Sequence, residues 1–405
     1  MWFSYAFKIT TKLGDKMNIL ETAAKYSDYQ IEKRRYFHEN PEISEFEFNT
    51  SKVVKEELDK IGVPWKACGL ETGVLATIKG AKPGKTILIR GDMDALTVQE
   101  DTGHSFASKN EGVMHACGHD CHTSMMLTAA HILNDMKSEL CGTVKLAFQP
   151  AEEVAKGAKS MIENGALEGV DGCFGIHVWS DVPAGHISCE PGPRMASADQ
   201  FTIRVTGKGG HGAAPHQCID AAVVSSAIVN NLQTIVSREI APVDSAVVTV
   251  GRMDVGTRWN VVAENAVLEG TSRCFSNETW ELLPERIESI AKDTAKVFRA
   301  EAEVENIRLV PPTINDEMMS SIACEAAKTI MGEEAPVSAE ATMGGEDFAF
   351  FMQQVPGAVA LLGVGNEACG AVWPQHSGKF CVDESALIKG AMLYAQVAMD
   401  FNARP

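Results

Sequence analysis

Short apolar strands that alternate with helices constrain this chain most. Candidate strands lie at 74–80, 86–92, 143–149 and 172–178, and a helical pattern at 122–136 falls between the second and third. Strands this apolar are typically buried on both faces, as in a parallel sheet that helices cover on both sides. We therefore predict an α/β fold whose central sheet is mostly parallel.

Segments on either side extend this pattern. Apolar residues recur at helical spacing before the first strand, with a break at Pro41. The same alternation returns near the end of the chain. The remaining elements predicted for this part of the fold are helices at 18–36, 45–61, 316–331 and 384–401 and a strand at 357–364.

The middle of the chain has a different order of elements. Strands and helices follow as β-α-β-β-α-β, predicted at 200–208, 220–237, 245–253, 265–275, 278–298 and 302–310. That order is typical of a ferredoxin-like α+β sandwich. We predict that residues 197–308 form this smaller domain. It is inserted into a larger domain made of 17–196 and 309–405, and residues 1–16 are predicted to be a disordered extension.

Length, net charge and cysteine content argue against several classes of protein and of partner. A chain of 405 residues is long for a single core, so two domains are expected. A formal net charge of −18 argues against a nucleic-acid or anionic-membrane partner. No apolar run reaches the about 20 residues of a membrane span, and the first residues lack signal-peptide features. Eleven scattered cysteines indicate free thiols in a reducing compartment, which predicts a cytoplasmic protein.

The segment HACGHDCHT, residues 115–123, carries the strongest chemical signal. Six of its nine residues could bind a metal or move a proton. We predict that it joins a short strand to a helix. Cys117 and His119 are one residue apart, so on an extended chain both would face the same metal cluster. The alternative is a chance cluster of buried cysteine and surface histidine.

Three further segments place candidate ligands at predicted strand ends or in a loop. AFQPAEEV ends a strand and supplies Glu152 and Glu153, GIHVW places His177 at a strand end, and PQHSGKF places His376 in a loop. Paired glutamates are common on surfaces, and a lone histidine in an apolar run is often a core residue. However, the carboxyl ends of parallel strands are where α/β sheets build their sites.

Together these segments offer five ligands, namely Cys117, His119, Glu153, His177 and His376. Five are too many for one tetrahedral catalytic metal that keeps an open position, but they suit two metals that share a ligand. A thiolate or a carboxylate can bridge two metals, whereas a neutral imidazole normally cannot. Cys117 is therefore the predicted bridge. The donor types leave Mn, Zn, Co and Ni open.

Six ordered motifs resemble one enzyme family. HACGHD, QPAEE, GIHVW, GKGGHGAAPH, GGEDFAFF and PQHSGKF, spread over roughly residues 25–402, are similar to the amidohydrolase branch of the two-metal aminoacylase/carboxypeptidase superfamily. That branch includes aminoacylases, hippurate hydrolases and plant hydrolases of auxin–amino acid conjugates. The resemblance implies a phosphorylase/hydrolase-like catalytic domain with an inserted lid domain. It also implies two divalent metal ions on the five ligands, with Glu152 as general base.

The strand predicted at 86–92 indicates which branch of the superfamily the chain resembles. Other branches carry His-x-Asp here, but this chain reads RGDMDAL, with Asp92 and Asp94 and no histidine. The ligand set thus resembles the cysteine-containing branch. Asp94 would then orient a metal ligand without touching the metal. Alternatively, it is only a turn residue at the strand end.

The resemblance also implies roles for three residues of the lid domain. His211, in GKGGHGAAPH, would polarise the scissile carbonyl, often from a partner subunit. Asn260 and Arg273 resemble contacts to the oxyanion and to the substrate carboxylate. The guanidinium fork of an arginine suits a carboxylate because it bonds both oxygens. Alternatively, Arg273 is an ordinary surface residue on a strand.

The implied reaction is hydrolysis of the amide bond of small N-acyl amino acids. The alternatives are a dipeptidase or carboxypeptidase that acts on free peptides, and a non-catalytic metal-containing binding protein. A homodimer through the lid domain is expected because a small sheet has exposed edges. No nucleic-acid or membrane partner is expected.

Overall fold

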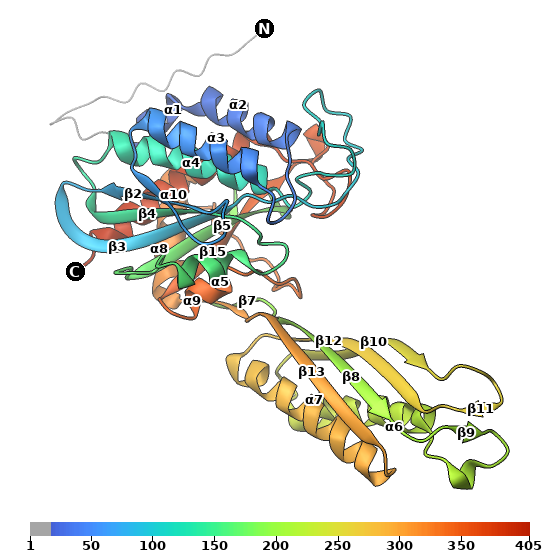
Figure 1. Cartoon of the computed structure of the whole chain (residues 1–405). Coiled ribbons are helices and arrows are strands. Elements are labelled where there is room, and N and C mark those ends of the chain that lie inside the picture. The colour runs from blue at the N-terminus through green and yellow to red at the C-terminus, as the bar shows by residue number, and fades with distance from the viewer. Residues whose placement is uncertain (1–17) are drawn as a thin grey trace.

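The computed structural model describes residues 18–405 and has two lobes (Figure 1). The extension predicted at 1–16 lies outside the described residues. We call residues 198–310 the small lobe and the rest of the described chain the large lobe. The chain crosses between the lobes beside β7 (Gly192–Met195) and β14 (Thr313–Asn315), which pair antiparallel. The predicted boundaries at 197 and 308 fall next to these crossings, and their status as domain limits stays a prediction.

A seven-stranded sheet forms the centre of the large lobe. Its four middle strands run parallel, and antiparallel strands flank them on both sides. The predicted α/β fold with a mostly parallel sheet is confirmed, although the antiparallel edges were not predicted. In spatial order the strands are β1 (Trp65–Ala67), β2 (Val74–Lys79), β4 (Cys141–Gln149), β3 (Lys82–Asp92), β5 (Gly172–Pro183), β15 (Gly357–Gly365) and β6 (Ile187–Ser188).

Alternate side chains of the strands serve two separate cores. Ile87 and Ile89 of β3 belong to the larger core, and Leu88 between them belongs to a second one. The helices that share the larger core are α1 (Ile19–Ala24), α2 (Ser27–Glu39), α3 (Phe48–Ile61), α4 (His119–Asp135), α8 (Glu317–Met331) and α10 (Leu387–Asn402). The helices that share the second core are α5 (Gly157–Glu163) and α9 (Ala349–Met352). The short 3-10 helices of this lobe are η3 (Glu367–Cys369) and η4 (Glu384–Ala386).

The small lobe is an antiparallel four-stranded sheet with two helices against it, and they share their own core. In spatial order the strands are β10 (Ala246–Val255), β12 (Asn265–Cys274), β8 (Ala198–Thr206) and β13 (Glu301–Val310). The helices are α6 (Ala221–Thr234), continued by η2 (Ile235–Glu239), and α7 (Asn277–Val297). This order of elements confirms the predicted ferredoxin-like sandwich.

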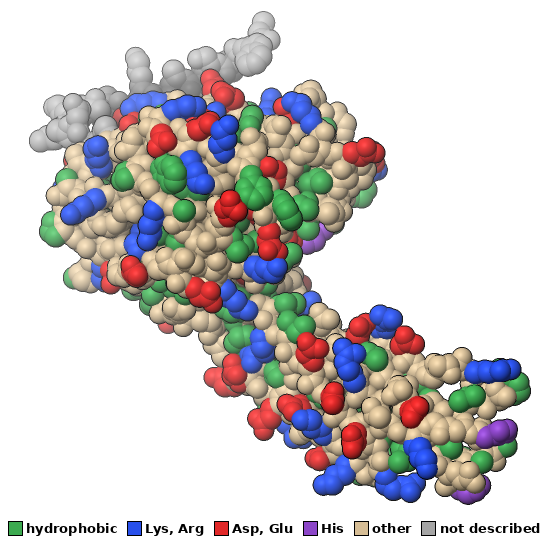
Figure 2. Space-filling view, viewed as in Figure 1, with side chains coloured by type: hydrophobic (Ala, Val, Ile, Leu, Met, Phe, Trp, Pro, Cys, Tyr) green, Lys and Arg blue, Asp and Glu red, His purple; other side chains and the backbone are tan. Residues whose placement is uncertain are grey.

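A short ribbon stands at the end of the small lobe away from the large lobe (Figure 1). It pairs β9 (Gly210–His211) with β11 (Val261–Val262), and η1 (Pro215–Gln217) follows β9. Figure 2 shows histidine side chains exposed at this end. We call residues 256–262 together with β9 the tip.

Two global features accompany this fold. No helix within residues 18–405 is long and apolar enough to cross a membrane. All eleven cysteines lie in that range and none is in a disulfide, as the sequence analysis expected.

Candidate metal centre

A tight turn before α4 brings the first ligands together. The prediction of a short strand directly before this helix is wrong. Met114 makes only an isolated bridge, to Leu96, and α4 begins at His119. Gly118 has a φ of 87°, and a Cβ at this position would lie 2.4 Å from Cγ2 of Val178. Only glycine tolerates both conditions. The turn, rather than an extended strand, therefore sets the spacing of Cys117 and His119.

The five predicted ligands form two groups that share one residue. Cys117, His119 and His177 offer ligand atoms that all lie within 4.8 Å of one another. Cys117, Glu153 and His376 form a second group by the same measure. The four segments that hold these residues are far apart in the sequence. Folding thus brings all five together, with the Cys117 sulfur common to both groups.

The two buried histidines are oriented by contacts at Nδ1. Nδ1 of His177 donates to the carbonyl oxygen of Val178 at 2.7 Å, which leaves Nε2 3.4 Å from Sγ of Cys117. Nδ1 of His119 lies 3.3 Å from Oδ1 of Asp94, and its Nε2 lies 3.8 Å from Oε1 of Glu153. Each ring therefore turns Nε2 toward the other ligands. The prediction that His177 lies at a strand end is wrong, because β5 continues past His177 to its end at residue 183.

The donor atoms of this cluster fit divalent cations. Nε2 of His119 and Oε1 of Glu153 are buried and have no hydrogen-bond partner among the described residues. Burying a polar atom without a partner costs free energy of folding, and a bound cation would supply the missing partner. Burial and the charge of Glu153 raise the pKa of the Cys117 thiol, so a cation is also what would make this sulfur a thiolate. Thiolate, imidazole and carboxylate together suit Mn, Zn, Co or Ni.

Glu152 lies beside the candidate ligands, and the pKa of its carboxyl group is strongly shifted. It follows the end of β4 through Ala151, whose φ is 53°. Burial raises the pKa of Glu152 well above its usual range, and the carboxylates of Glu346 and Glu153 add to the effect. The backbone N–H of Asp347 lies 3.4 Å from its Oε1. A carboxylate that takes up a proton readily is suited to acid–base chemistry.

Asp94 connects the glutamate turn to the histidine ligand. Its two oxygens accept the backbone N–H groups of Glu152 and Glu153, each at 3.1 Å. The Ser44 hydroxyl donates to Oδ2 at 2.6 Å, and Oδ1 faces Nδ1 of His119. Asp94 therefore contacts three of the candidate site residues at once. A mere turn residue would not do this.

A buried arginine under the site was missed by the sequence analysis. Arg90 of β3 lies 2.6 Å from Oδ2 of Asp92 and 2.9 Å from oxygens of both Glu346 and Asp347. Its Nε donates to the side chain of Gln149 at 2.8 Å. This cation offsets the carboxylates packed beneath Glu152. Nothing in the local pattern of an apolar strand pointed to it, because the partners lie far away in the sequence.

His122 was also not singled out, and it has a different role from the ligands. Nδ1 lies 2.5 Å from Oδ1 of Asp92, while Nε2 accepts the backbone N–H of Val178 at 2.9 Å. Because a backbone N–H only donates, Nδ1 carries the proton. Both ring nitrogens are therefore engaged, and His122 fixes the strand next to His177 rather than offering a free ligand atom.

The structure does not bring His211 and Asn260 to the metal cluster of the same chain. His211 pairs with Val261, and the N–H of Gly212 donates to the carbonyl oxygen of Asn260 at 3.0 Å. These two residues are thus neighbours at the tip. Figure 1 shows β9 and β11 at the end of the small lobe that points away from the large lobe.

Arg273, in contrast, shares a cavity with the cluster. This cavity, of about 390 Å³, lies between the lobes. Nη1 of Arg273 is buried and has no hydrogen-bond partner within residues 18–405, and burial lowers the pKa of the guanidinium. The cavity has polar walls from both lobes and apolar walls beside them. Its lining residues are Glu152, Glu153, Val154, Ala155, Ala198, Arg273, Leu309, Val310, Gly345 and His376.

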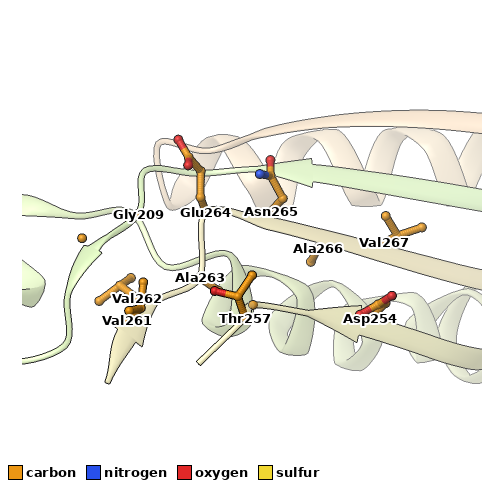
Figure 3. A pocket seen from close by; sticks show the side chains of 12 residues that line it. Gly209, Asp254, Thr257, Val261, Val262, Ala263, Glu264, Asn265, Ala266 and Val267 are labelled. Atoms are coloured by element: carbon orange, nitrogen blue, oxygen red, sulfur yellow. The ribbon is translucent and has the colours of Figure 1, made fainter. Parts of the chain in front are cut away.

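A second cavity, in the small lobe, has carboxylates in its lining but neither a thiol nor an imidazole. It measures about 430 Å³ and lies where the tip meets the start of β12 (Figure 3). Its two carboxylates, Asp254 and Glu264, lie at opposite ends in Figure 3. Its lining, all within the described chain, includes no cysteine or histidine. This cavity is therefore no candidate for a metal centre.

Comparisons with known proteins agree with this site. Residues 88–400 match the model of peptidase family M20/M25/M40. The chain is 41% identical to thermostable carboxypeptidase 1 of Saccharolobus solfataricus, covering 93% of this chain and 96% of the relative. It is also 41% identical to an N-acetylcysteine deacetylase of Bacillus subtilis, covering 91% and 96%.

Among solved structures, the chain resembles the YXEP protein of Bacillus subtilis, described as a dinuclear metal binding peptidase from the M20 family. The TM-score is 0.82 at 37% identity, covering 93% of this chain and 98% of that one. The family match spans most of the sequence, and the donor cluster fits divalent metal ions. The chain therefore belongs to peptidase family M20/M25/M40 and is a metal-dependent amidohydrolase.

Proposed function

We propose that this enzyme hydrolyses N-acyl amino acids to a carboxylic acid and a free amino acid. The observation behind the proposal is the interlobe cavity, where Arg273 lines the same space as Glu152, Glu153 and His376. An arginine fork is suited to the carboxylate of the amino-acid product. The relative named N-acetylcysteine deacetylase supports a substrate of this kind.

The chain's own residues supply most of the mechanism. Two divalent ions held by Cys117, His119, Glu153, His177 and His376 would lower the pKa of a water molecule toward neutrality. Glu152 takes the proton of the attacking water, which its raised pKa favours. Glu152 then gives that proton to the nitrogen of the leaving amine. Arg273 holds the substrate carboxylate and so fixes the amide bond relative to Glu152.

His211 and Asn260 complete the proposed site from a second copy of the chain. Both lie at the tip, away from the cluster of their own chain. As donors they would stabilise the negative charge that develops on the carbonyl oxygen. β10 and β13 are the two edge strands of the small-lobe sheet and offer edges for pairing, so we propose a homodimer through this lobe. The eleven free thiols support a cytoplasmic location.

Amino-acid release from a panel of substrates tests this proposal. The chelated enzyme is assayed with and without added Mn²⁺, Zn²⁺ or Co²⁺ on N-acyl amino acids and on simple amides that lack a carboxylate. We expect metal-dependent release from the N-acyl amino acids, and far less from the simple amides. Equal rates on both would contradict the role of the carboxylate, and the ranking of acyl groups defines the pocket.

The second candidate function is a carboxypeptidase or dipeptidase. The relative named thermostable carboxypeptidase 1 favours it, because its identity equals that of the deacetylase relative. Arg273 could hold the C-terminal carboxylate of a peptide equally well. Unblocked dipeptides in the same panel separate the two functions. Metal-dependent activity on dipeptides alone would establish the second candidate.

A further inference from the structure

The tip exposes an aromatic side chain that makes no hydrogen bond or ring contact with the other described residues. Trp259 is 89% exposed and precedes Asn260 directly, and Val261 next to it is 44% exposed. Arg258, on the other side, is exposed too. An indole is a large apolar group, and such groups on a surface often mark an interaction site. The ribbon of β9 and β11 holds this segment beside His211.

A cavity on the large lobe has complementary walls. It measures about 580 Å³ and lies between the outer end of β5 and the segment 337–343. Trp179, Val182, Pro183, Val337 and Met343 give it apolar walls, and Asp181 and Glu340 add two exposed carboxylates.

This cavity is next to the metal cluster. The ring centroid of Trp179 lies 5.5 Å from that of His177, with the two rings edge to face. Thr342, at the far wall, donates its backbone N–H to Arg194 beside the interlobe crossing. No lysine or arginine is found among the lining residues, all of which belong to the part of the chain that the structure describes. His186 also lines the cavity, so its ionisable side chains are two carboxylates and one imidazole, and its wall residue Trp179 contacts the candidate ligand His177.

We propose that Trp259 of the partner subunit occupies this cavity, and that the partner's Arg258 faces Asp181 and Glu340. The occupant is a second copy of this chain because its tip matches the cavity in both respects, with an exposed indole for the apolar walls and a cation for the two carboxylates. The tip of the same chain is no alternative, since it points away from its own large lobe (Figure 1).

Docking of the indole would have a consequence for catalysis. Trp259 is adjacent to Asn260, and His211 lies across the ribbon, so the same contact brings both donors to the side of the cluster that His177 occupies. Trp259 is thus a positioning residue for the delivery of His211. This inference rests on the proposed function only in assigning His211 and Asn260 to the oxyanion, because the docking itself does not depend on the substrate.

Site-specific photocrosslinking tests the docking without an activity assay. Benzoylphenylalanine replaces Trp259, and the full-length variant is mixed with isotope-labelled chains so that crosslinks between copies are recognised by mass. A matched control places the same group at Val243, which is 91% exposed in the same lobe. We expect crosslinks from 259 to peptides 179–186 or 337–343 of the other copy, and none of these from 243.

Two results would overturn the docking. They are crosslinks from 259 that stay within one chain, and crosslinks that reach only the small lobe of the other copy. The charge contact is tested separately: Arg258→Glu should lower kcat about tenfold, and the double change Asp181→Arg with Glu340→Arg should restore it. Absence of rescue would contradict the contact. Inter-copy crosslinks in an enzyme that is silent on N-acyl amino acids would leave the docking intact and reject the proposed function instead.

Discussion

The large-lobe cluster and the small-lobe tip are built in opposite ways. Cys117, His119 and Glu153 are held by turns and strand ends inside a packed lobe, and their ligand atoms already lie within reach of one another. His211 and Asn260 lie on a two-stranded ribbon with open surface around it. The metal cluster is thus assembled within the chain, whereas the proposed oxyanion donors lie on an open surface.

The difference shows what each half depends on. In the large lobe, backbone groups and buried carboxylates fix the ligands, so substitutions there should change metal content or chemistry directly. In the proposed dimer, the position of the small-lobe residues depends on a contact with a second copy of the chain, so substitutions there should leave the metal site intact.

The largest effect is expected for Glu152→Gln. Glutamine cannot take or give the proton, so kcat should fall by on the order of 100-fold or more, about 2.7 kcal/mol of transition-state stabilisation. Metal content should stay normal, as measured by elemental analysis. Glu153→Gln is the matched control, since it should lose metal as well as activity. Near-normal turnover of Glu152→Gln would remove this residue as the base.

Asp94→Ala should have the next largest effect. It removes the acceptor for the N–H groups of Glu152 and Glu153 and for the His119 ring. Loss of a partner that orients a ligand typically costs about 10–100-fold in metal affinity or activity. Metal titration of the chelated variant measures this. An exposed carboxylate, Asp101, serves as control, and an unchanged affinity in Asp94→Ala would make Asp94 a structural turn residue.

Arg273→Ala should act on substrate binding rather than on metal. Loss of a hydrogen bond to a charged group costs about 1.5–3 kcal/mol, so KM for N-acyl amino acids should rise by roughly tenfold or more. Rates on simple amides should hardly change, because they lack the carboxylate. Equal losses on both substrate types would assign Arg273 to the structure of the lobe crossing.

A smaller effect concerns stability in acid. Burial raises the pKa of Glu100, but hydrogen bonds from His38, Thr102 and Ser108 outweigh it and lower that pKa from 4.5 to about 2. The folded state then binds fewer protons than the unfolded state, so this stabilisation is full above pH 4.5 and is lost as pH falls toward 2.

Urea unfolding of the metal-free protein at about pH 6 and about pH 3 measures this contribution. Glu100→Gln should be less stable than the parent chain at the higher pH, and the gap should narrow at the lower one. A gap that is constant with pH would mean that shape, and not charge, makes Glu100 important.

The sequence predicted the architecture well, and it named the five candidate ligands that the fold brings together. Continuous apolar strands predicted the parallel sheet, and the β-α-β-β-α-β order predicted the small lobe. Cys117, His119, Glu153, His177 and His376 followed from residue types that bind metals and that stand at strand ends or in loops. These features are local, so a single chain displays them in its pattern.

The rest depends on contacts between distant segments. Arg90 pairs with residues at 346 and 347, and His122 is held by Asp92 and by the backbone of Val178, none of which a local pattern reveals. The turn at Gly118 was expected to be a strand because spacing alone does not distinguish the two. The location of His211 relative to the cluster is likewise a property of the fold.

Complementation between two inactive variants tests the central claim most directly. Glu152→Gln and His211→Ala are purified separately, mixed under conditions that allow the copies to exchange, and assayed on an N-acyl amino acid with added metal. If the tip of one copy completes the site of another, mixed dimers contain one intact site, and roughly a quarter of the wild-type activity should return. If His211 acts in its own chain, no mixture can contain an intact site, and the activity of the mixture would stay at the level of the two variants.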